Sequence, residues 1–408
     1  MSNIYPADWD IVPFGNFIQS FKNGYGRRPK AVEQGPIVLR LADVAKGCID
    51  FSDVRRVAMS SDEFETFRIA QGDLLFTRVN GSRDYVGKCI RVSENYTDVA
   101  FNDHLIRVRV NSAVNAHFIE CLFADERTRA NLLAFIPIAS GAQLTINQTA
   151  LENIMIPLPP LPEQRAIAAI LSTWDEALTL TKRLIDALKR RKAALMQLLL
   201  TGEVRFSEFD GAWEEIRLGD FLKLNLRKVA KPNNPYYALS LRNRGQGTLV
   251  RFVKDPTSVE MEHLYEVREG DLIVSITFAW EGSIAIACSD ADGKLVSHRF
   301  PTYVFDKSKV NPDFFKHLMI TDDFFFQLGL ISPGGAGRNR VLSKKDFVQL
   351  TVNVPELAEQ MKIGGLLSAY DEYIDGFESY LTQLTTQKRG LMQQLLTGTV
   401  RIEVDKEI

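Results

Sequence analysis

The chain contains a long internal repeat, and this repeat restricts the possible folds more than any other feature of the 408 residues. Glu163-Gln164 returns as Glu359-Gln360, an offset of 196 positions (359 − 163 = 196). At the same offset, the pattern KxxLMQxLLTGxVR that begins at Lys192 begins again at Lys388. Self-similarity at a fixed offset indicates duplicated structural units. We therefore expect two related globular units, each followed by one copy of the repeated segment.

Both copies of the repeated segment have the apolar spacing of a helix with a heptad seam. The first copy, from 163 to 199, corresponds to about 55 Å of helix at 1.5 Å per residue. Pro162 suits a first helical turn, and Gly202 and Gly398 suit the residue that ends each helix. The matched register favours packing of the two seams against each other over burial in two separate cores. The seam residues expected to pack between the helices are Ile167, Leu171, Trp174, Leu178, Ile185, Leu188, Ile363, Leu367, Tyr370, Ile374, Phe377, Leu381 and Leu384.

Small residues occupy equivalent places near the start of the two helices, as Ala168-Ala169 and Gly364-Gly365. Glycine inside a helix costs about 0.5 to 1 kcal/mol relative to alanine, so two in succession need a structural reason. We predict that these residues let the two helix backbones approach each other closely.

The two stretches outside the repeated segments are rich in short β-prone runs, with some helical patterns. Leu74–Thr77 and Leu272–Ile276 are examples of expected strands, whereas 117–133 and 312–328 have a helical pattern and place Phe324 to Phe326 in a core. Each stretch is expected to form a compact α/β (α+β) domain. The predicted domains are 1–155, 206–350 and the two spacer helices within 156–205 and 351–408.

Enzyme signatures are weak. The run from Gly81 to Cys89 resembles a phosphate-binding loop, but it has five residues between its glycines and ends in Cys instead of Ser or Thr. Asn233-Asn234-Pro235-Tyr236 lacks the second proline of the amino-methyltransferase motif, and the five histidines form no metal or triad spacing. We expect no catalytic residue, no cofactor-binding residue and no metal ligand in this chain.

Charge and cysteine usage limit the class of protein further. The formal net charge of −2 means that a nucleic-acid surface must be local. The four cysteines form no C-x-x-C pair, and no apolar run approaches the roughly 18 to 20 residues of a membrane helix. These features predict a soluble, cytoplasmic protein.

Loops rich in Arg, Asn and Gln are the candidate binding residues. Arg reads guanine through two hydrogen bonds, and Asn or Gln reads adenine in the same way, so such loops suit the DNA major groove. The alternative is that they are ordinary solvated loops. The candidates in the first stretch are Arg78, Asn80, Arg83, Gln143 and Asn147, and those in the second are Arg242, Asn243, Arg244, Arg338, Asn339 and Arg340. The run 189–192 is interpreted instead as a solvated or partner-facing helix stripe.

The proline-rich entry from Ile156 through Glu163-Gln164 to Ile167, followed by Leu195-Met196-Gln197 and Thr201-Gly202, resembles the specificity subunit of type I restriction-modification systems. The resemblance covers essentially the whole chain, although Val352 to Gln360 has lost the proline run of the first copy. Trp9 with Gly15 and Trp213 with Gly219 resemble the starts of the family's recognition domains.

This resemblance implies two target-recognition domains separated by two long antiparallel coiled-coil helices with a pseudo-twofold repeat. Each domain would read one half of a split, asymmetric site in double-stranded DNA. The chain itself would be a non-catalytic subunit. Two methyltransferase (modification) subunits would supply adenine methylation with adenosylmethionine, and restriction subunits would supply ATP- and magnesium-dependent translocation and cleavage. The alternatives are a single-chain restriction-methylation enzyme and a coiled-coil scaffold without DNA binding.

Overall fold

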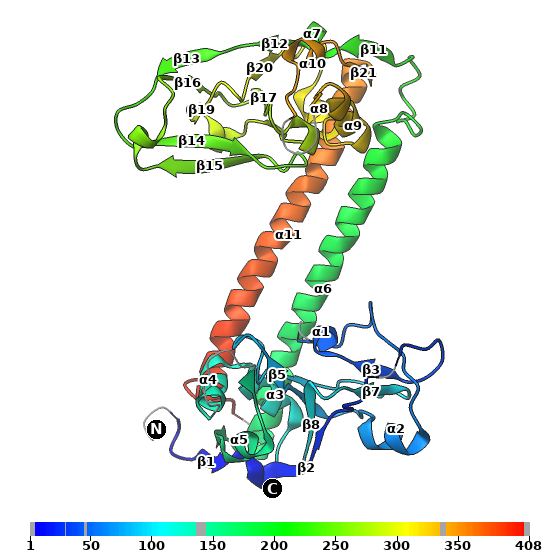
Figure 1. The fold of residues 1–408 in the computed structure, drawn as a ribbon, viewed down its shortest axis with the longest axis vertical. Helices are drawn as coiled ribbons and strands as arrows, with labels where there is room; N and C mark the ends of the chain where they lie inside the picture. The colour runs from blue at the N-terminus through cyan, green and yellow to red at the C-terminus, as the bar shows by residue number, and fades with distance from the viewer. Residues whose placement is uncertain (1–4, 29, 45–46, 136–143, 335–339, 404–408) are drawn as a thin grey trace. The chain divides into compact units, whose positions relative to one another are not determined.

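The computed structural model describes residues 5–28, 30–44, 47–135, 144–334 and 340–403, and it divides into two compact units. Unit 1 comprises residues 1–182 and 380–408, and unit 2 comprises residues 183–379 (Figure 1). Each unit combines a globular part with one half of each long helix, α6 (Leu161–Leu199) and α11 (Leu357–Thr397). The compact units therefore divide the chain within the helices, whereas the predicted domain boundaries lie at the helix ends and stay a prediction.

Each unit contains a four-stranded antiparallel sheet of the same strand order within its described residues. In unit 1 the order is β2 (Ile18–Asn23), β8 (Leu105–Val110), β4 (Leu74–Thr77) and β6 (Cys89–Arg91). In unit 2 it is β12 (Leu222–Leu224), β20 (Thr302–Phe305), β17 (Leu272–Val274) and β18 (Ile284–Ile286). The internal repeat in the sequence is thus also a repeat of strand topology, although few equivalent positions in the two sheets have the same residue.

The remaining repeated elements surround each sheet. In unit 1 they are η1 (Phe14–Phe17), α3 (Ala116–Ala124), α4 (Glu126–Ala134), α5 (Gln148–Asn153) and the antiparallel pair β1 (Asp10–Pro13) with β10 (Met155–Leu158). In unit 2 they are α7 (Leu218–Phe221), α8 (Pro312–Leu318), α9 (Asp322–Leu330), α10 (Lys344–Phe347) and the antiparallel pair β11 (Glu214–Arg217) with β21 (Thr351–Val354).

The helical patterns at 117–133 and 312–328 are confirmed, and each stretch forms two helices with a break between them. The break has a capping cause, because the side chains of Asp125 and Thr321 accept hydrogen bonds from backbone N–H groups at the starts of α4 and α9. Phe324 is buried as predicted, but Phe326 is 66% exposed, so its assignment to the core is wrong.

The units differ in the segments that connect the strands of their four-stranded sheets. Unit 1 has a parallel pair, β3 (Ile37–Leu39) with β7 (Val99–Phe101), and the short helices α1 (Leu41–Val44) and α2 (Ser61–Phe67). Unit 2 has a five-stranded sheet in the order β13 (Arg227–Ala230), β16 (His263–Glu266), β19 (Leu295–Val296), β14 (Tyr236–Leu241) and β15 (Thr248–Val253). The short elements η2 (Pro256–Ser258) and η4 (Ser289–Ala291) lie in its connections.

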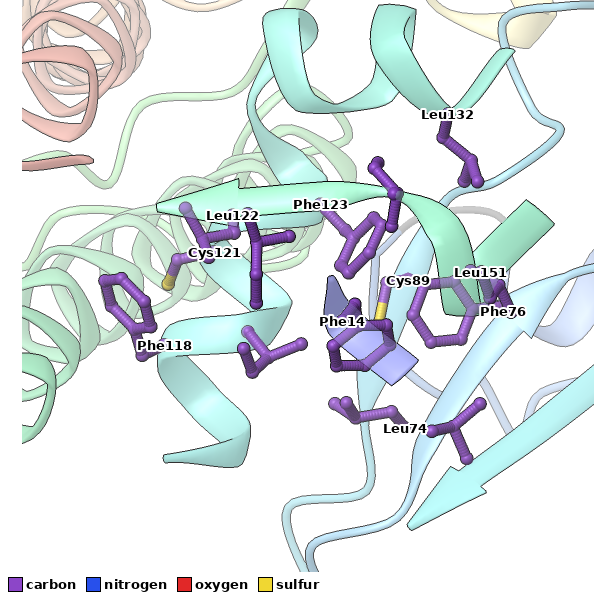
Figure 2. Packing of buried hydrophobic residues seen from close by; sticks show 14 of the residues in the cluster. Phe14, Leu74, Phe76, Cys89, Phe118, Cys121, Leu122, Phe123, Leu132 and Leu151 are labelled. Atoms are coloured by element: carbon purple, nitrogen blue, oxygen red, sulfur yellow. The ribbon is translucent and has the colours of Figure 1, made fainter. Parts of the chain in front are cut away.

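The long helices join the cores of the globular parts. In unit 1, Phe14, Phe76 and Phe123 pack edge to face with centroid distances of 4.9 and 5.3 Å to Phe123 (Figure 2). Ile167 and Leu171 of α6 belong to the same buried cluster, and Ile363 and Leu367 of α11 belong to the core of unit 2. Burial of each such side chain contributes about 1.5 to 3 kcal/mol, so the helix starts are held by the globular parts.

Within each unit the two helix halves run antiparallel. In unit 2, Lys189 pairs with Glu378 at 2.6 Å, and Lys192, further along α6, pairs with Asp371, earlier in α11. In unit 1, Lys388 of α11 pairs with Asp175 of α6 at 2.5 Å. The predicted seam residues beyond the cores lie on the covered face: Ile185, Ile374 and Leu384 are buried, and Trp174, Leu178, Leu188, Tyr370, Phe377 and Leu381 are half-buried.

The repeated Glu-Gln pair forms the joint between helix and globular part. The Gln164 side chain accepts a hydrogen bond from the backbone N–H of Asn115 at 2.9 Å, and Gln360 accepts one from Asn311 at the same distance. Buried Glu163 binds the Arg401 guanidinium, and buried Glu359 binds that of Arg205 in the equivalent way. The hydrogen bonds that the Arg401 guanidinium donates to the carboxylates of Asp8 and Glu163 raise the pKa of Arg401. The repeated pattern therefore encodes a joint in which each helix start is bound to the segment that follows the end of the other helix.

Gly364 faces α8 and not the partner helix. A Cβ atom there would lie 2.6 Å from the backbone N of Phe314, whereas a Cβ on Gly365 would meet nothing within 4 Å among the described residues. The prediction that these small residues serve a close approach of the two long helices is therefore wrong, since the close approach is between α11 and the N-terminus of α8.

His317 of α8 is fully buried beside the helix pair in unit 2. Its Nε2 lies 3.2 Å from Ser368 Oγ and 4.0 Å from Asp371 Oδ2, and Lys192 and Lys316 are the other charged groups around it. Burial lowers the pKa of His317 to about 4, and Lys192 acts in the same direction.

We expect this histidine to make stability fall as the pH decreases from about 6.5 towards 4. His317 takes up a proton at about pH 6.5 in the unfolded chain but only near pH 4 in the folded chain. The stabilisation by neutral His317 is therefore complete above pH 6.5 and is lost as the pH falls towards 4. Thermal melting of the intact chain across this pH range, compared with His317→Gln, measures the effect. An equally steep decline in His317→Gln would assign the dependence to other groups.

Candidate DNA interface

The candidate residues of unit 1 lie at the end of the central strand β4. Arg78 follows β4, and its guanidinium donates to the backbone oxygen of Asp103 at 3.1 Å. Asn80 lies in β5 (Val79–Asn80), which pairs with β9 (Leu144–Thr145), so the two predicted loops are brought side by side. The side-chain oxygens of Asn80 and Asn147 accept the backbone N–H groups of Ser82 and Ala150, and Arg83 is exposed.

The candidate residues of unit 2 gather around η3 (Ala279–Glu281), which follows β17. The turn between β14 and β15 holds Arg242, Asn243 and Arg244, and the Asn243 amide donates to the Glu281 carboxylate. Arg244 has a left-handed backbone with φ of 53°, and its N–H donates to the backbone oxygen of Glu281 at 3.0 Å. The guanidinium carbon of Arg340 lies over the Trp280 ring, 5.2 Å from the ring centroid. Residues nearly 100 positions apart therefore form one polar and aromatic cluster.

These two clusters occupy equivalent places. In unit 1 the backbone N–H of Ile146 donates to the oxygen of Arg78, and in unit 2 that of Leu342 donates to the oxygen of Ile276. The positions correspond at the repeat offsets (342 − 146 = 196; 276 − 78 = 198). The side chains at these equivalent places differ, as expected for a common scaffold that presents different binding groups.

Gln143, Arg338 and Asn339 lie outside the described residues, so three of the candidates have no place in this geometry. The fold also adds residues that the sequence patterns did not indicate. Arg299 is exposed, and its backbone oxygen accepts from Ile276 as that of His104 accepts from Arg78. Trp280 and Glu281 were missed because only the fold brings η3 beside the 242–244 turn. The role of all these residues in DNA reading stays a prediction.

The side chains of the two clusters suit recognition of a nucleic acid. Guanidinium and amide groups supply hydrogen-bond donors for base edges or phosphates, Glu281 supplies an acceptor, and Trp280 supplies a flat apolar surface. Within the described residues, no group of three or more His, Cys, Asp or Glu side chains is placed to hold a metal ion. The helices of the described part include none that is long and apolar enough to cross a membrane. Each cluster instead presents donors and acceptors on a rigid strand end.

Taken together, the fold defines a class of protein built from two topologically equivalent units with polar clusters at equivalent strand ends. Residues 54–190 match the family model of the type I restriction modification DNA specificity domain. The MjaX specificity subunit of a type I restriction enzyme from Methanocaldococcus jannaschii is 24% identical, covering 98% of this chain and 95% of that one. The EcoKI specificity subunit from Escherichia coli is 29% identical over 43% of this chain and 38% of its own length.

Solved structures have the same fold. The crystal structure of the type I restriction-modification S subunit from M. genitalium superimposes with a TM-score of 0.61 at 14% identity, covering 99% of this chain and 98% of that one. A structure described in terms of complex assembly and conformational transition of the type I system has a TM-score of 0.54 at 16% identity, covering 97% and 99%. The chain is thus similar over nearly its whole length to a specificity subunit of a type I restriction enzyme.

Proposed function

We propose that this chain is the DNA-recognition subunit of a type I restriction-modification complex and that its two units read the two halves of a bipartite, asymmetric target. The observation that carries this proposal is the pair of clusters at equivalent strand ends with different side chains. One scaffold used twice with different donors and acceptors accounts for a target whose halves differ in sequence.

The same proposal assigns the chemistry to other subunits. Modification subunits would bind adenosylmethionine and methylate adenine, and restriction subunits would use ATP and magnesium; this chain would be non-catalytic and would hold none of these. Its two methyltransferase partners would dock on the helix pair, and the complex would act in the cytoplasm on double-stranded DNA. A clamp completed by partners also agrees with the net charge of −2, because this chain need not carry all the phosphate-binding charge.

We expect Arg340→Ala to alter only the half-site that unit 2 reads. Loss of a base contact costs about 1 to 3 kcal/mol and relaxes one position, whereas loss of a phosphate contact weakens all sequences together. Arg83→Ala is the matched variant for unit 1. Sequencing of methylated sites in cells that carry each variant separates these results. A change of both half-sites by Arg340→Ala would contradict the assignment of one half-site to each unit.

A further inference from the structure

Unit 2 has an open groove on its surface. The equivalent position in unit 1 is filled by part of the chain itself. The groove has a volume of about 820 Å³ and is lined by residues from the end of α6, the start of α9 and the β11–β21 pair. Its apolar wall includes Met196, Leu200 and Trp213. The Nε1 of Trp213 is buried without a hydrogen-bond partner among the described residues, whereas Trp9 in unit 1 donates to Glu163 at 3.3 Å.

The internal repeat shows what fills the equivalent place in unit 1. There the Tyr5 ring stacks on Trp9 at a centroid distance of 6.4 Å, and Pro6 packs against Gly398. Burial raises the pKa of Tyr5, and the charges of Asp125 and Arg127 act on it as well. Trp9, Asp125 and Arg127 correspond to the groove residues Trp213, Thr321 and Asp323 at the repeat offsets of 204 and 196. A tyrosine-proline segment of the chain itself therefore occupies the place that is open in unit 2.

Two large apolar side chains extend the groove along α9. Phe326 and Leu330 are 66% and 67% exposed, and helical spacing puts them on the same face as Asp323 and Gln327, which line the groove. Their counterparts in unit 1 are Ala130 and Ala134 (326 − 130 = 196; 330 − 134 = 196). Exposed apolar residues next to a groove mark an interaction surface more often than isolated ones do.

The charge of the groove restricts its occupant. Glu215, Asp322 and Asp323 line it, and the described residues of its lining include no Lys, Arg or His. Asp323 accepts a hydrogen bond from Gln327, and Glu215 accepts one from Thr351, but neither contact neutralises a carboxylate. The N-terminal segment of a second copy is a poor occupant, because Asp8 and Asp10 make it acidic.

We propose that this groove binds an extended, basic segment of a partner polypeptide that inserts an aromatic side chain followed by proline, as Tyr5-Pro6 does within unit 1. Phe326 and Leu330 pack on the apolar residues of that segment, and the three carboxylates bind its basic side chains. The proposal does not depend on which DNA sequence the chain reads.

The test is a binding measurement on the full chain with a labelled peptide of sequence KKYPLKK, followed by fluorescence anisotropy. Ala193 lines the groove and neighbouring Ala194 does not, and both are exposed on α6, so they form a matched pair. We expect Ala193→Trp to weaken peptide binding by at least about tenfold and Ala194→Trp to leave it unchanged. Phe326→Ala with Leu330→Ala, which recreates the residues of unit 1, is expected to weaken binding by a similar factor without unfolding the chain.

Comparison peptides separate the possible occupants. DDYPLDD is expected to bind at least about tenfold more weakly than KKYPLKK, with the difference reduced by salt. Equal effects of the two alanine-to-tryptophan variants, or no saturable binding of KKYPLKK, would overturn the proposal. Tighter binding of a peptide with residues 1–12 of this chain, with dimers in solution, would overturn it in favour of a second copy.

Discussion

Gly364→Ala is expected to destabilise unit 2, and Gly365→Ala is expected to stabilise it. The Cβ of an alanine at 364 would lie 2.6 Å from Phe314 N and 2.9 Å from the carbonyl carbon of Asp313, both backbone atoms that cannot rotate away. Overpacking of this kind costs about 1 to 3 kcal/mol, which exceeds the roughly 0.5 to 1 kcal/mol that alanine gains over glycine in a helix. A Cβ at position 365 would meet no atom of the described residues within 4 Å, so Gly365→Ala has only the favourable effect of the higher helix propensity of alanine.

Thermal or denaturant unfolding of the two single variants tests this prediction directly. Both variants replace glycine by alanine in α11, and they differ only in whether the backbone of α8 lies against the new methyl group. Ala168, the counterpart of Gly364, is buried in the core of unit 1, so Ala168→Gly should destabilise through helix propensity and the loss of a buried methyl group. Stabilisation by Gly364→Ala would show that α8 moves away at little cost, and the explanation for this glycine would have to be abandoned.

A second large effect is expected from deletion of residues 181–187 together with 377–383. Seven residues keep the heptad register of both helices, and the pairs Lys192–Asp371 and Lys388–Asp175 lie outside the deleted segments. Each helix shortens by about 10 Å, equivalent to about three base-pair steps. If the long helices set the distance between the half-sites, the methylated target should keep both half-sites and lose about three base pairs of the gap.

The control for this deletion removes 181–187 alone. The heptad phase is then kept, but α6 is about 10 Å shorter than α11, so the variant should assemble poorly. A complex that carries both deletions, remains active and methylates the original gap would show that partner subunits set the spacing.

Features that depend on local pattern and on the internal repeat could be predicted from the sequence. The long helix expected at 163–199 is α6 at Leu161–Leu199, and the expected strand Leu74–Thr77 is β4. Gly202 and Gly398 have φ of 74° and 68° after the helix ends, as a terminating glycine requires. Periodicity and helix-end signals lie within a few residues of the element that they specify, so they can be recognised without tertiary contacts.

Features that depend on distant contacts could not be predicted. The helical patterns at 117–133 and 312–328 do not reveal the breaks that precede α4 and α9, where Asp125 and Thr321 are the N-caps. The neighbour of Gly364 is a residue about 50 positions away, and the cluster of Asn243, Glu281 and Arg340 forms through turns on different strands. Residue type at single positions does not reveal which loops meet.

The central claim is that this chain determines the DNA sequence on which a type I complex acts. Mapping of methylated adenines across the genome, with the gene deleted and then restored, tests it most directly. We predict that methylation at one bipartite, asymmetric motif disappears with the deletion, returns with the restored gene, and loses specificity in the unit 2 half alone when Arg340→Ala is restored instead. Unchanged methylation after deletion, or the loss of a single contiguous motif, would contradict the account.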